Sequence, residues 1–275
     1  MEVAYFEMQG AGNKIVVVDQ REQNLPPPET SRLRELAQGD DGSFFDQLMW
    51  VSPSDDPACI ASYRVFNTDG SEVEQCGNGV RCVARILARE PQHADAFTLA
   101  SPVGPVAVRM AGDLVSVSMG VPEFEPALVP FDAVRAAAHY TLDAGGEQHR
   151  VQVVSMGNPH CVLQVDRVAN AAVGELGPEI ETHRRFPEKT NVGFMQVLDR
   201  QNIELRVHER GVGETLACGT GACAAVVCGQ QSGLLDERVT VSLPGGQLVV
   251  SWSGNREPVW LTGNAELISE GTLQL

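Results

Sequence analysis

The sequence predicts an α+β fold built from two duplicated domains, and three observations lead to this prediction. Most of the chain consists of short β-patterned segments between Gly, Pro and Asp turns. Only three segments have a helical pattern. A long motif of the first half recurs in the second half, and the 275 residues suffice for two domains of about 140 residues each.

The predicted strands are short segments bounded by Gly, Pro and Asp turns. They cover residues 14–19, 60–66, 103–110, 114–119, 151–156, 161–165, 203–208, 239–243 and 247–252.

The three predicted helices differ in pattern. The first covers 31–38, after a proline-rich segment. The second begins after Cys76 and ends before Pro91, with apolar residues at helical spacing. Its other face carries arginines four residues apart, which predicts a solvated face. The third begins after Cys218 and is apolar on all sides, as in a buried helix. The arginines are Arg81, Arg85 and Arg89.

The internal repeat aligns residues 63–79 with residues 205–221 without a gap, about half the chain apart. Gly12-Asn13 is echoed at a similar distance by Gly157-Asn158. We therefore expect one domain over 1–120, joined by the C-terminal strand at 264–275, and a second over 121–263. The identical pairs are Arg64/Arg206, Val65/Val207, Glu72/Glu214, Cys76/Cys218, Gly77/Gly219 and Gly79/Gly221.

Composition and charge exclude several classes of function. The net charge of −16 repels phosphate backbones and acidic membranes, so we expect neither a nucleic-acid nor a membrane partner. The first residues show no basic stretch before an apolar run, so we expect no signal peptide, and the longest apolar run, 222–228, is too short to span a membrane. A cytoplasmic location is expected. The seven cysteines include no Cys-x-x-Cys pair, and no metal site is expected.

Each copy of the repeat opens a helix with Cys-Gly-x-Gly, at Cys76 and at Cys218. The glycines bring backbone N–H groups close to a ligand, and the helix N-terminus favours an anion and a lower thiol pKa. The remaining cysteines lack this context and are expected in the core. They are Cys59, Cys82, Cys161, Cys223 and Cys228.

Two such thiols could act in three ways. They could form and break a disulfide, or one could be a nucleophile with the other a bystander. Alternatively, a thiolate could remove a proton from one face of a stereocentre while a thiol returns one to the opposite face. The third use needs no pyridoxal lysine, which fits a chain whose only lysines are Lys14 and Lys189. The residues leave all three open, and no cofactor is expected.

The chain resembles the diaminopimelate epimerase family over most of its length, from Asn13 to the turn at 244–246. The resemblance implies cofactor-independent interconversion of LL- and meso-2,6-diaminopimelate, in lysine and peptidoglycan precursor synthesis. It also implies two pseudo-symmetric domains, each a barrel-like, mostly antiparallel sheet around a central helix, with the active site in the cleft between them. The resemblance rests on residues 66–72, 75–82, 156–160 and 209–221.

The resemblance also implies roles for individual residues. Cys76 and Cys218 correspond to the paired acid and base, and His160 and Glu209 to groups that tune the thiols. Arg210 would hold the distal carboxylate as a fork and Glu209 an ammonium group. A homodimer is implied, although Ile268-Ser269-Glu270 lacks an aromatic that helps dimers in some relatives. The substrate-binding residues would be Asn13, Gln47, Asn67, Gly77, Asn78, Asn158, Asn191, Glu209, Arg210, Gly219 and Thr220.

The chain departs from the family pattern at two places, Lys14-Ile15 and the acidic segment 40–46 before Gln47. Two alternative functions remain. One is a related racemase of the proline or hydroxyproline type, which has a histidine where this chain has Asn78 and lacks Glu209-Arg210. The other is a thiol redox sensor or amino-acid-binding module without turnover.

Overall fold

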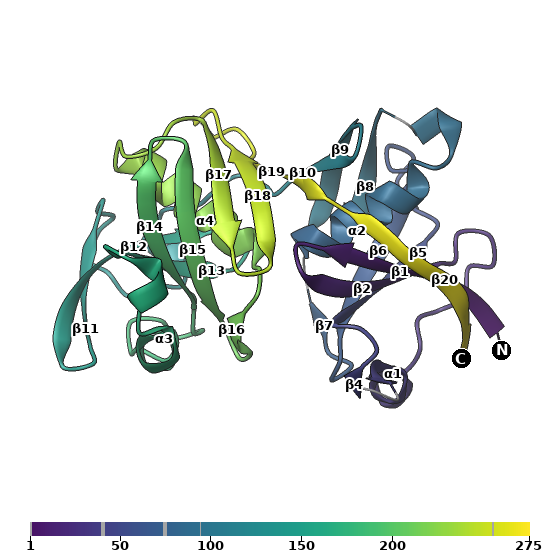
Figure 1. Cartoon of the computed structure of the whole chain (residues 1–275), viewed down its shortest axis with the longest axis horizontal. Coiled ribbons are helices and arrows are strands. Elements are labelled where there is room, and N and C mark those ends of the chain that lie inside the picture. Colours follow the sequence, from purple (N-terminus) through teal and green to yellow (C-terminus); the bar gives the residue numbers. More distant parts are fainter. Residues whose placement is uncertain (1, 40–41, 74–75, 94, 255) are drawn as a thin grey trace. The chain divides into compact units, whose positions relative to one another are not determined.

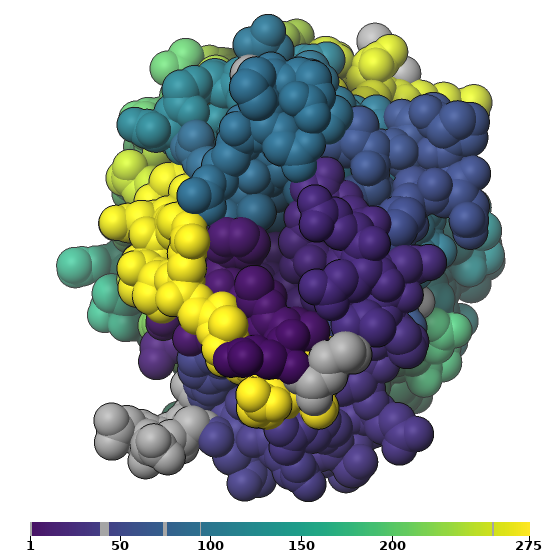
Figure 2. Space-filling model, turned by 90° about the vertical axis from the view of Figure 1, so that its right-hand side faces the viewer, coloured from purple at the N-terminus to yellow at the C-terminus, as the bar shows by residue number. Residues whose placement is uncertain are grey.

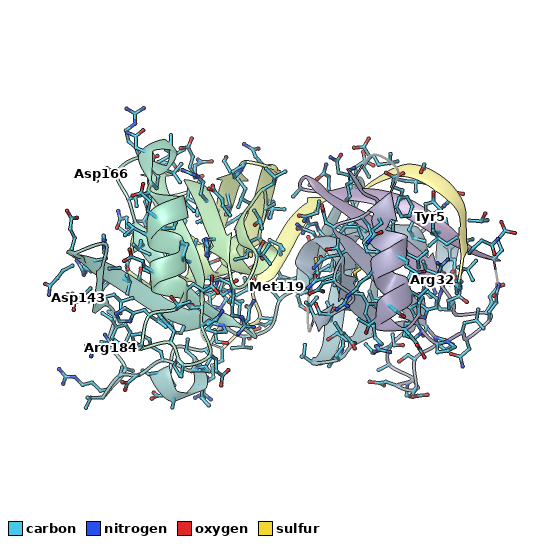
Figure 3. All side chains as sticks on the ribbon, turned by 90° about the horizontal axis from the view of Figure 1, so that it is seen from below. Tyr5, Arg32, Met119, Asp143, Asp166 and Arg184 are labelled. Carbon is cyan, nitrogen blue, oxygen red and sulfur yellow. The ribbon has the colours of Figure 1, made fainter. Side chains whose placement is uncertain are left out.

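The computed structural model describes residues 2–39, 42–73, 76–93, 95–254 and 256–275. The chain divides into two compact units, Met1–Ser118 with Thr262–Leu275, and Met119–Leu261 (Figure 1). The sequence analysis had set the corresponding boundaries at 120–121 and 263–264. Figure 3 labels Met119, the residue at which the second unit begins.

The first unit is built around one curved mixed sheet. Its strands pair in the spatial order β20–β1–β2–β5–β6–β8–β9–β10, with β7 against β6. Among these pairings of described residues, β2–β5 and β6–β8 are parallel and the others antiparallel. In Figure 2 the C-terminal strand (yellow) lies beside the N-terminal strand (purple). The strands are β1 (Glu2–Gly10), β2 (Asn13–Asp19), β5 (Gln47–Ser52), β6 (Ala61–Asn67), β7 (Glu72–Val73), β8 (Ala96–Ser101), β9 (Gly104–Ala111), β10 (Leu114–Ser118) and β20 (Glu266–Gln274), with a separate ladder of β3 (Gln38–Gly39) and β4 (Gly42–Ser43).

The second unit has the same architecture. Its strands pair in the order β11–β12–β13–β14–β15–β17–β18, with β16 against β15 and with β13–β14 and β15–β17 parallel. β19 (Trp260–Asn264) carries the chain back to the first unit. The strands are β11 (Tyr140–Ala144), β12 (Glu147–Ser155), β13 (Pro159–Gln164), β14 (Asn191–Asp199), β15 (Asn202–Glu209), β16 (Gly213–Thr215), β17 (Arg238–Leu243) and β18 (Gly246–Ser251).

The two pairing patterns match strand for strand. From β1 to β9 the sequence of antiparallel and parallel pairings repeats from β12 to β18, so that β2 corresponds to β13, β5 to β14 and β6 to β15. This confirms the duplicated α+β fold predicted from the repeat.

Each sheet encloses one helix, α2 (Gly77–Leu87) in the first unit and α4 (Gly219–Gln231) in the second. α2 contacts β1, β2, β5, β10 and β20, and α4 contacts β12, β13, β14, β15 and β18. Such a position requires a helix that is apolar all round. α4 meets this requirement, because its residues from Gly219 to Gly229 are buried.

The prediction that the arginine face of the second helix is solvated is wrong for Arg81, which is fully buried. The sheet surrounds this end of α2, so even an arginine there cannot reach water. Its guanidinium instead donates to the Asn78 Oδ1 atom at 2.9 Å and to the Gly77 carbonyl at 3.3 Å. Arg85 is half-buried, and only Arg89 is exposed as predicted.

A second helix covers the outer face of each sheet, α1 (Thr30–Ala37) or α3 (Val173–Glu181) (Figure 3, where Arg32 marks α1). Successive side chains of β5 point alternately to the enclosed helix α2 and to the outer helix α1. Met49 faces α2 at Gly79, while Leu48 and Trp50 pack with Leu33 of α1. The strands are therefore buried on both faces, as continuous apolar runs require.

The sequence analysis predicted α1, α2 and α4 but not α3, whose interior contains Gly174, Gly177 and Pro178. Packing against β14, β15 and β16 stabilises this helix despite its poor intrinsic propensity. Among the residues that the structure describes, no helix is long and apolar enough to cross a membrane. Short 3-10 turns occur at Pro91–His93, Pro126–Leu128 and Val168–Asn170.

Candidate active site

Cys76 and Cys218 occupy the same structural position, the N-cap of the enclosed helix of each unit. The Cys76 Sγ atom accepts a hydrogen bond from the Gly79 amide at 3.2 Å, and Cys218 Sγ accepts one from the Gly221 amide at 3.4 Å. Both cysteines have extended backbones, with φ of −138° and −124°. Each sulfur thus lies where the helix dipole and the first amides favour a negative charge.

The glycine three residues after each cysteine is needed for space. A Cβ atom on Gly79 would lie only 2.4 Å from the Met49 sulfur, and one on Gly221 would lie 3.0 Å from a Val207 methyl group. The helix N-terminus therefore packs directly on the sheet in each unit.

In the first unit, four predicted substrate-binding residues are joined in pairs. The Asn78 side-chain amide donates to Asn13 Oδ1 at 2.7 Å, and the Gln47 amide donates to Asn67 Oδ1 at 3.2 Å. Gln47 is directly opposite Asn67 in the β5–β6 ladder. Carboxamides thus gather around the N-terminus of α2.

In the second unit, the predicted residues are also joined by hydrogen bonds. His160 Nε2 lies 2.9 Å from Asn158 Oδ1. The Asn191 side chain donates to the Pro159 carbonyl at 3.1 Å and accepts from the Arg210 backbone amide at 2.9 Å. Asn191 therefore ties the start of β13 to the turn that follows β15.

The strand registers relate the two sets residue by residue. Ile15 pairs with Gln47 in the first unit, and the corresponding pair in the second unit is His160 with Asn191. In the sequence repeat, Asn67 aligns with Glu209, and Asn78 aligns with Thr220. The first set is built from neutral carboxamides, whereas the second carries the ionisable Glu209, Arg210 and His160. The two half-sites thus share a framework but differ in charge.

The thiol of Cys218 has a pKa well above its usual value. Burial is the largest cause, and the negative charge of Glu209 is the second. The Thr220 hydroxyl, 3.5 Å from the sulfur, and the Gly221 amide act in the opposite direction. Without a ligand, Cys218 is therefore a protonated thiol at neutral pH.

Glu209 is itself oriented by a residue to which the sequence analysis gave no role. The Thr215 hydroxyl, on β16, donates to Glu209 Oε1. Thr215 lies in Gly-x-Gly-Glu-Thr, within the segment 209–221 that carries the family resemblance, and its place in that segment was the available signal.

His160 is buried, and burial followed by the positive charge of Arg210 lowers its pKa to about 3. The ring is therefore neutral across the physiological range and can act only as a hydrogen-bonding group. Arg210 is exposed, and its guanidinium donates to the Glu188 carbonyl at 3.1 Å. That carbonyl leaves most of the guanidinium fork free for an anionic ligand.

The five remaining cysteines are buried, as predicted from their lack of the helix-opening motif. Burial raises the pKa of Cys82, on α2, to about 12. Within the described ranges, no group of three or more His, Cys, Asp or Glu side chains could hold a metal ion.

The departures from the family pattern preserve the strand register. The Lys14 amide donates to Asp46 Oδ2, and the Asp46 amide donates to the Lys14 carbonyl, both at 2.8 Å. These bonds align β2 with β5 directly before Gln47. Asp40, Asp41 and Gln75, which the sequence analysis also discussed, lie outside the described residues.

Two comparisons of the sequence agree. The family model described as diaminopimelate epimerase matches residues 5–125 and 152–268. A protein of Alkalilimnicola ehrlichii named diaminopimelate epimerase is 48% identical over 280 aligned positions, which cover the whole of both chains.

Solved structures share the fold at much lower identity. A hydroxyproline epimerase of Agrobacterium vitis is 15% identical with a TM-score of 0.71, over 99% of this chain and 92% of that one. A PhzF-family phenazine biosynthesis protein of Enterococcus faecalis is 15% identical with a TM-score of 0.67, over the whole of both chains. At this identity the likeness concerns the fold alone.

Proposed function

Because this chain belongs to the diaminopimelate epimerase family, we propose that it epimerises LL-2,6-diaminopimelate to the meso form by proton transfer between Cys76 and Cys218, without a cofactor. The observation that supports these two residues is their shared position. Each thiol caps the enclosed helix of one unit and accepts a backbone amide three residues on. The reaction belongs to lysine and peptidoglycan precursor synthesis.

The helix N-termini account for binding of the reacting amino-acid end. The first amides of an α-helix have no acceptor within the helix, and they attract anions. In our proposal the amides of Gly77, Asn78, Gly219 and Thr220 hold the reacting carboxylate and stabilise the negative charge that it gains during the reaction.

The polar residues at the strand ends account for a substrate with two amino-acid ends. Carboxamides both donate and accept, so they can bind ammonium and carboxylate groups alike. Glu209 can take an ammonium group, and Arg210 can take the distal carboxylate with two parallel hydrogen bonds. The set in this proposal is Asn13, Gln47, Asn67, Asn158, Asn191, Glu209 and Arg210.

The proton transfer balances as follows. One cysteine, as the thiolate, takes the hydrogen from the α-carbon, and the C–H electron pair moves into the carboxylate as an enediolate. The other cysteine, as the thiol, gives its proton to the opposite face of the carbon, and the electron pair returns to form the new C–H bond. The enzyme is left with the two protonation states exchanged, ready for the reverse reaction.

We expect the reaction in deuterium oxide to label product and substrate unequally. The protonating thiol has exchanged with solvent, whereas the abstracting thiolate carries only the proton that it has just removed. Early in the conversion of LL-diaminopimelate, the meso product should carry deuterium at the inverted carbon while recovered substrate stays protiated. Chiral separation with mass spectrometry measures both labels. Equal labelling from the first turnovers would contradict a two-base reaction, and absence of any conversion would favour a binding module or redox sensor.

We expect replacement of Glu209 by glutamine to lower the pKa of Cys218. Removing a negative charge beside a thiol stabilises its thiolate form, while the larger effect of burial remains. Alkylation of Cys218 by iodoacetamide, followed by peptide mass spectrometry as a function of pH, should then begin at lower pH. Glu204→Gln, on the same strand, is the matched control and should leave the profile unchanged. An unshifted profile in Glu209→Gln would show that this carboxylate does not tune the thiol.

We also propose that the enzyme acts in the cytoplasm, where its substrate is made, and as a homodimer. The exposed Leu267 and Ile268 on β20 support a homodimer, because apolar side chains at a strand are common in interfaces. Light scattering on the purified protein tests this, and a mass equal to one 29.6 kDa chain would contradict it.

A further inference from the structure

We propose that Glu181 is a positioning residue for substrate recognition, which it serves by fixing the backbone of the turn that carries Arg210. Glu181 is the last residue of α3 and is only 6% exposed. This inference rests on the proposed function, because it concerns the group that would bind the distal end of diaminopimelate.

The Glu181 carboxylate receives hydrogen bonds from three separate segments. His208 Nε2 lies 2.8 Å from Oε2, while the Gly211 amide at 3.1 Å and the Lys189 ammonium at 3.4 Å approach Oε1. Burial alone raises the pKa of this carboxyl group, but these donors outweigh burial and hold the pKa below its usual value. Glu181 is therefore an ionised acceptor at neutral pH, and His208 donates to it.

The two amides that flank the Arg210 α-carbon are both held by buried side chains. The Arg210 amide donates to Asn191 Oδ1, and the next amide, that of Gly211, donates to Glu181. Gly211 has a φ of +76°, which glycine adopts without strain. The backbone of Arg210 is thus fixed on both sides, although its side chain is exposed.

The packing of α3 is shaped to admit the His208 ring. A Cβ atom on Gly177 would lie 2.6 Å from His208 Cγ, whereas one on Gly174 would meet nothing within 4 Å. Glycine weakens a helix relative to alanine. At Gly177 this cost has a structural reason, because a side chain there would collide with His208, whereas Gly174 has no such neighbour. The space at Gly177 lets the ring reach the Glu181 carboxylate one turn later.

The outer helix of the first unit holds the equivalent turn by different contacts. Arg34 of α1 donates to the Asp69 carbonyl at 2.6 Å, and Thr30 packs so closely on Gly70 that a Cβ atom would lie 2.7 Å away. This turn follows Asn67, the counterpart of Glu209. Support of the turn by the outer helix therefore recurs in both units, and only the second uses a buried carboxylate for it.

We expect Glu181→Gln to raise KM for LL-diaminopimelate about tenfold and to change kcat by less than about threefold. A glutamine has one acceptor oxygen in place of two, and its amide would meet a donor. The turn would then hold Arg210 less firmly. The distal carboxylate is bound equally in the ground state and the transition state. Weakening its contact with Arg210 therefore raises KM and not kcat. Glu175→Gln, on an exposed position of α3, is the control and should change neither constant.

A double-mutant cycle separates positioning from a general structural role. If Glu181 acts through Arg210, then Glu181→Gln should raise KM little further in an Arg210→Gln background. Independent, multiplicative effects on KM would overturn the proposal, as would a fall in kcat at unchanged KM. Should Glu181→Gln fail to fold, Gly177→Ala displaces the His208 ring while keeping every hydrogen-bonding group. It should raise KM in the same way, and an unchanged KM in Gly177→Ala would overturn the proposal.

A measurement without substrate keeps this inference distinct from the proposed function. Hydrogen exchange of the Gly211 amide, followed by NMR, should be at least about tenfold faster in Glu181→Gln than in wild type or Glu175→Gln. If wild type fails to convert diaminopimelate, the proposed function fails. The exchange result still tests whether Glu181 holds the Gly211 amide. Unchanged exchange in Glu181→Gln would overturn the role of Glu181, whatever the activity.

Discussion

We expect Cys76→Ala and Cys218→Ala each to lower the rate of epimerisation by at least about 10³-fold in both directions. Each thiol acts as the base in one direction and as the acid in the other, so neither can be spared in either direction. Alanine keeps the helix-opening backbone but leaves no atom that can exchange a proton with the α-carbon. A chiral assay that starts from LL- and, separately, from meso-diaminopimelate under reducing conditions measures both rates.

Cys59→Ala and Cys228→Ala are the controls, because these cysteines are buried and lie outside the helix-opening motif. Both should keep most of their activity. A Cys218→Ala enzyme that retained substantial turnover would rule out the paired-thiol mechanism. Retention by Cys76→Ala alone would instead assign the chemistry to one half-site.

The duplicated fold could be predicted because the repeat preserves the residues that shape a tight local structure. Cys-Gly-x-Gly recurs since each helix N-terminus packs on a sheet, and a Cβ atom on Gly79 or Gly221 would meet Met49 or Val207. Apolar residues at helical spacing located α2, and the all-round apolar pattern located α4, because an enclosed helix must be apolar on nearly every side.

Two features could not be predicted because contacts far away in the sequence decide them. Arg81 has the spacing of a solvated arginine, yet the enclosing sheet buries it, and the first turn of α2 supplies the carbonyl and carboxamide acceptors. The helix α3 contains two glycines and a proline, and only its packing on β14, β15 and β16 stabilises it. Local propensity is a weak guide where tertiary contacts dominate.

Some residues of the candidate site could likewise be predicted from the sequence, and others could not. The repeat pairs Asn67 with Glu209 directly, but the equivalence of Gln47 and Asn191 emerges only from the strand registers. The segments between the repeated motifs have diverged too far to align. Glu181 is also out of reach of sequence reasoning, since nothing in its neighbourhood on α3 indicates the buried hydrogen bonds that it accepts.

We expect the guanidinium of Arg210 to make a large contribution to substrate binding. In our proposal it takes the distal carboxylate of diaminopimelate with two parallel hydrogen bonds, while the Glu188 carbonyl holds only one of its nitrogens. Removing a charged partner of this kind leaves a carboxylate without its counter-ion. We therefore expect Arg210→Gln to raise KM by about 100-fold.

The conservative variant Arg210→Lys tests the geometry of this contact separately from its charge. Lysine keeps the positive charge but cannot make two parallel bonds, so KM should rise by only about tenfold. In both variants kcat should fall far less than KM rises, because the distal carboxylate does not change charge during the reaction. Steady-state kinetics with LL-diaminopimelate measure both constants, and Arg184→Gln, at an exposed arginine of the same unit (Figure 3), is the control for net charge.

Equal KM values in Arg210→Gln and wild type would show that another group recognises the distal end. A large fall in kcat at constant KM would instead place Arg210 beside the reacting carbon, where a neighbouring positive charge would stabilise the enediolate.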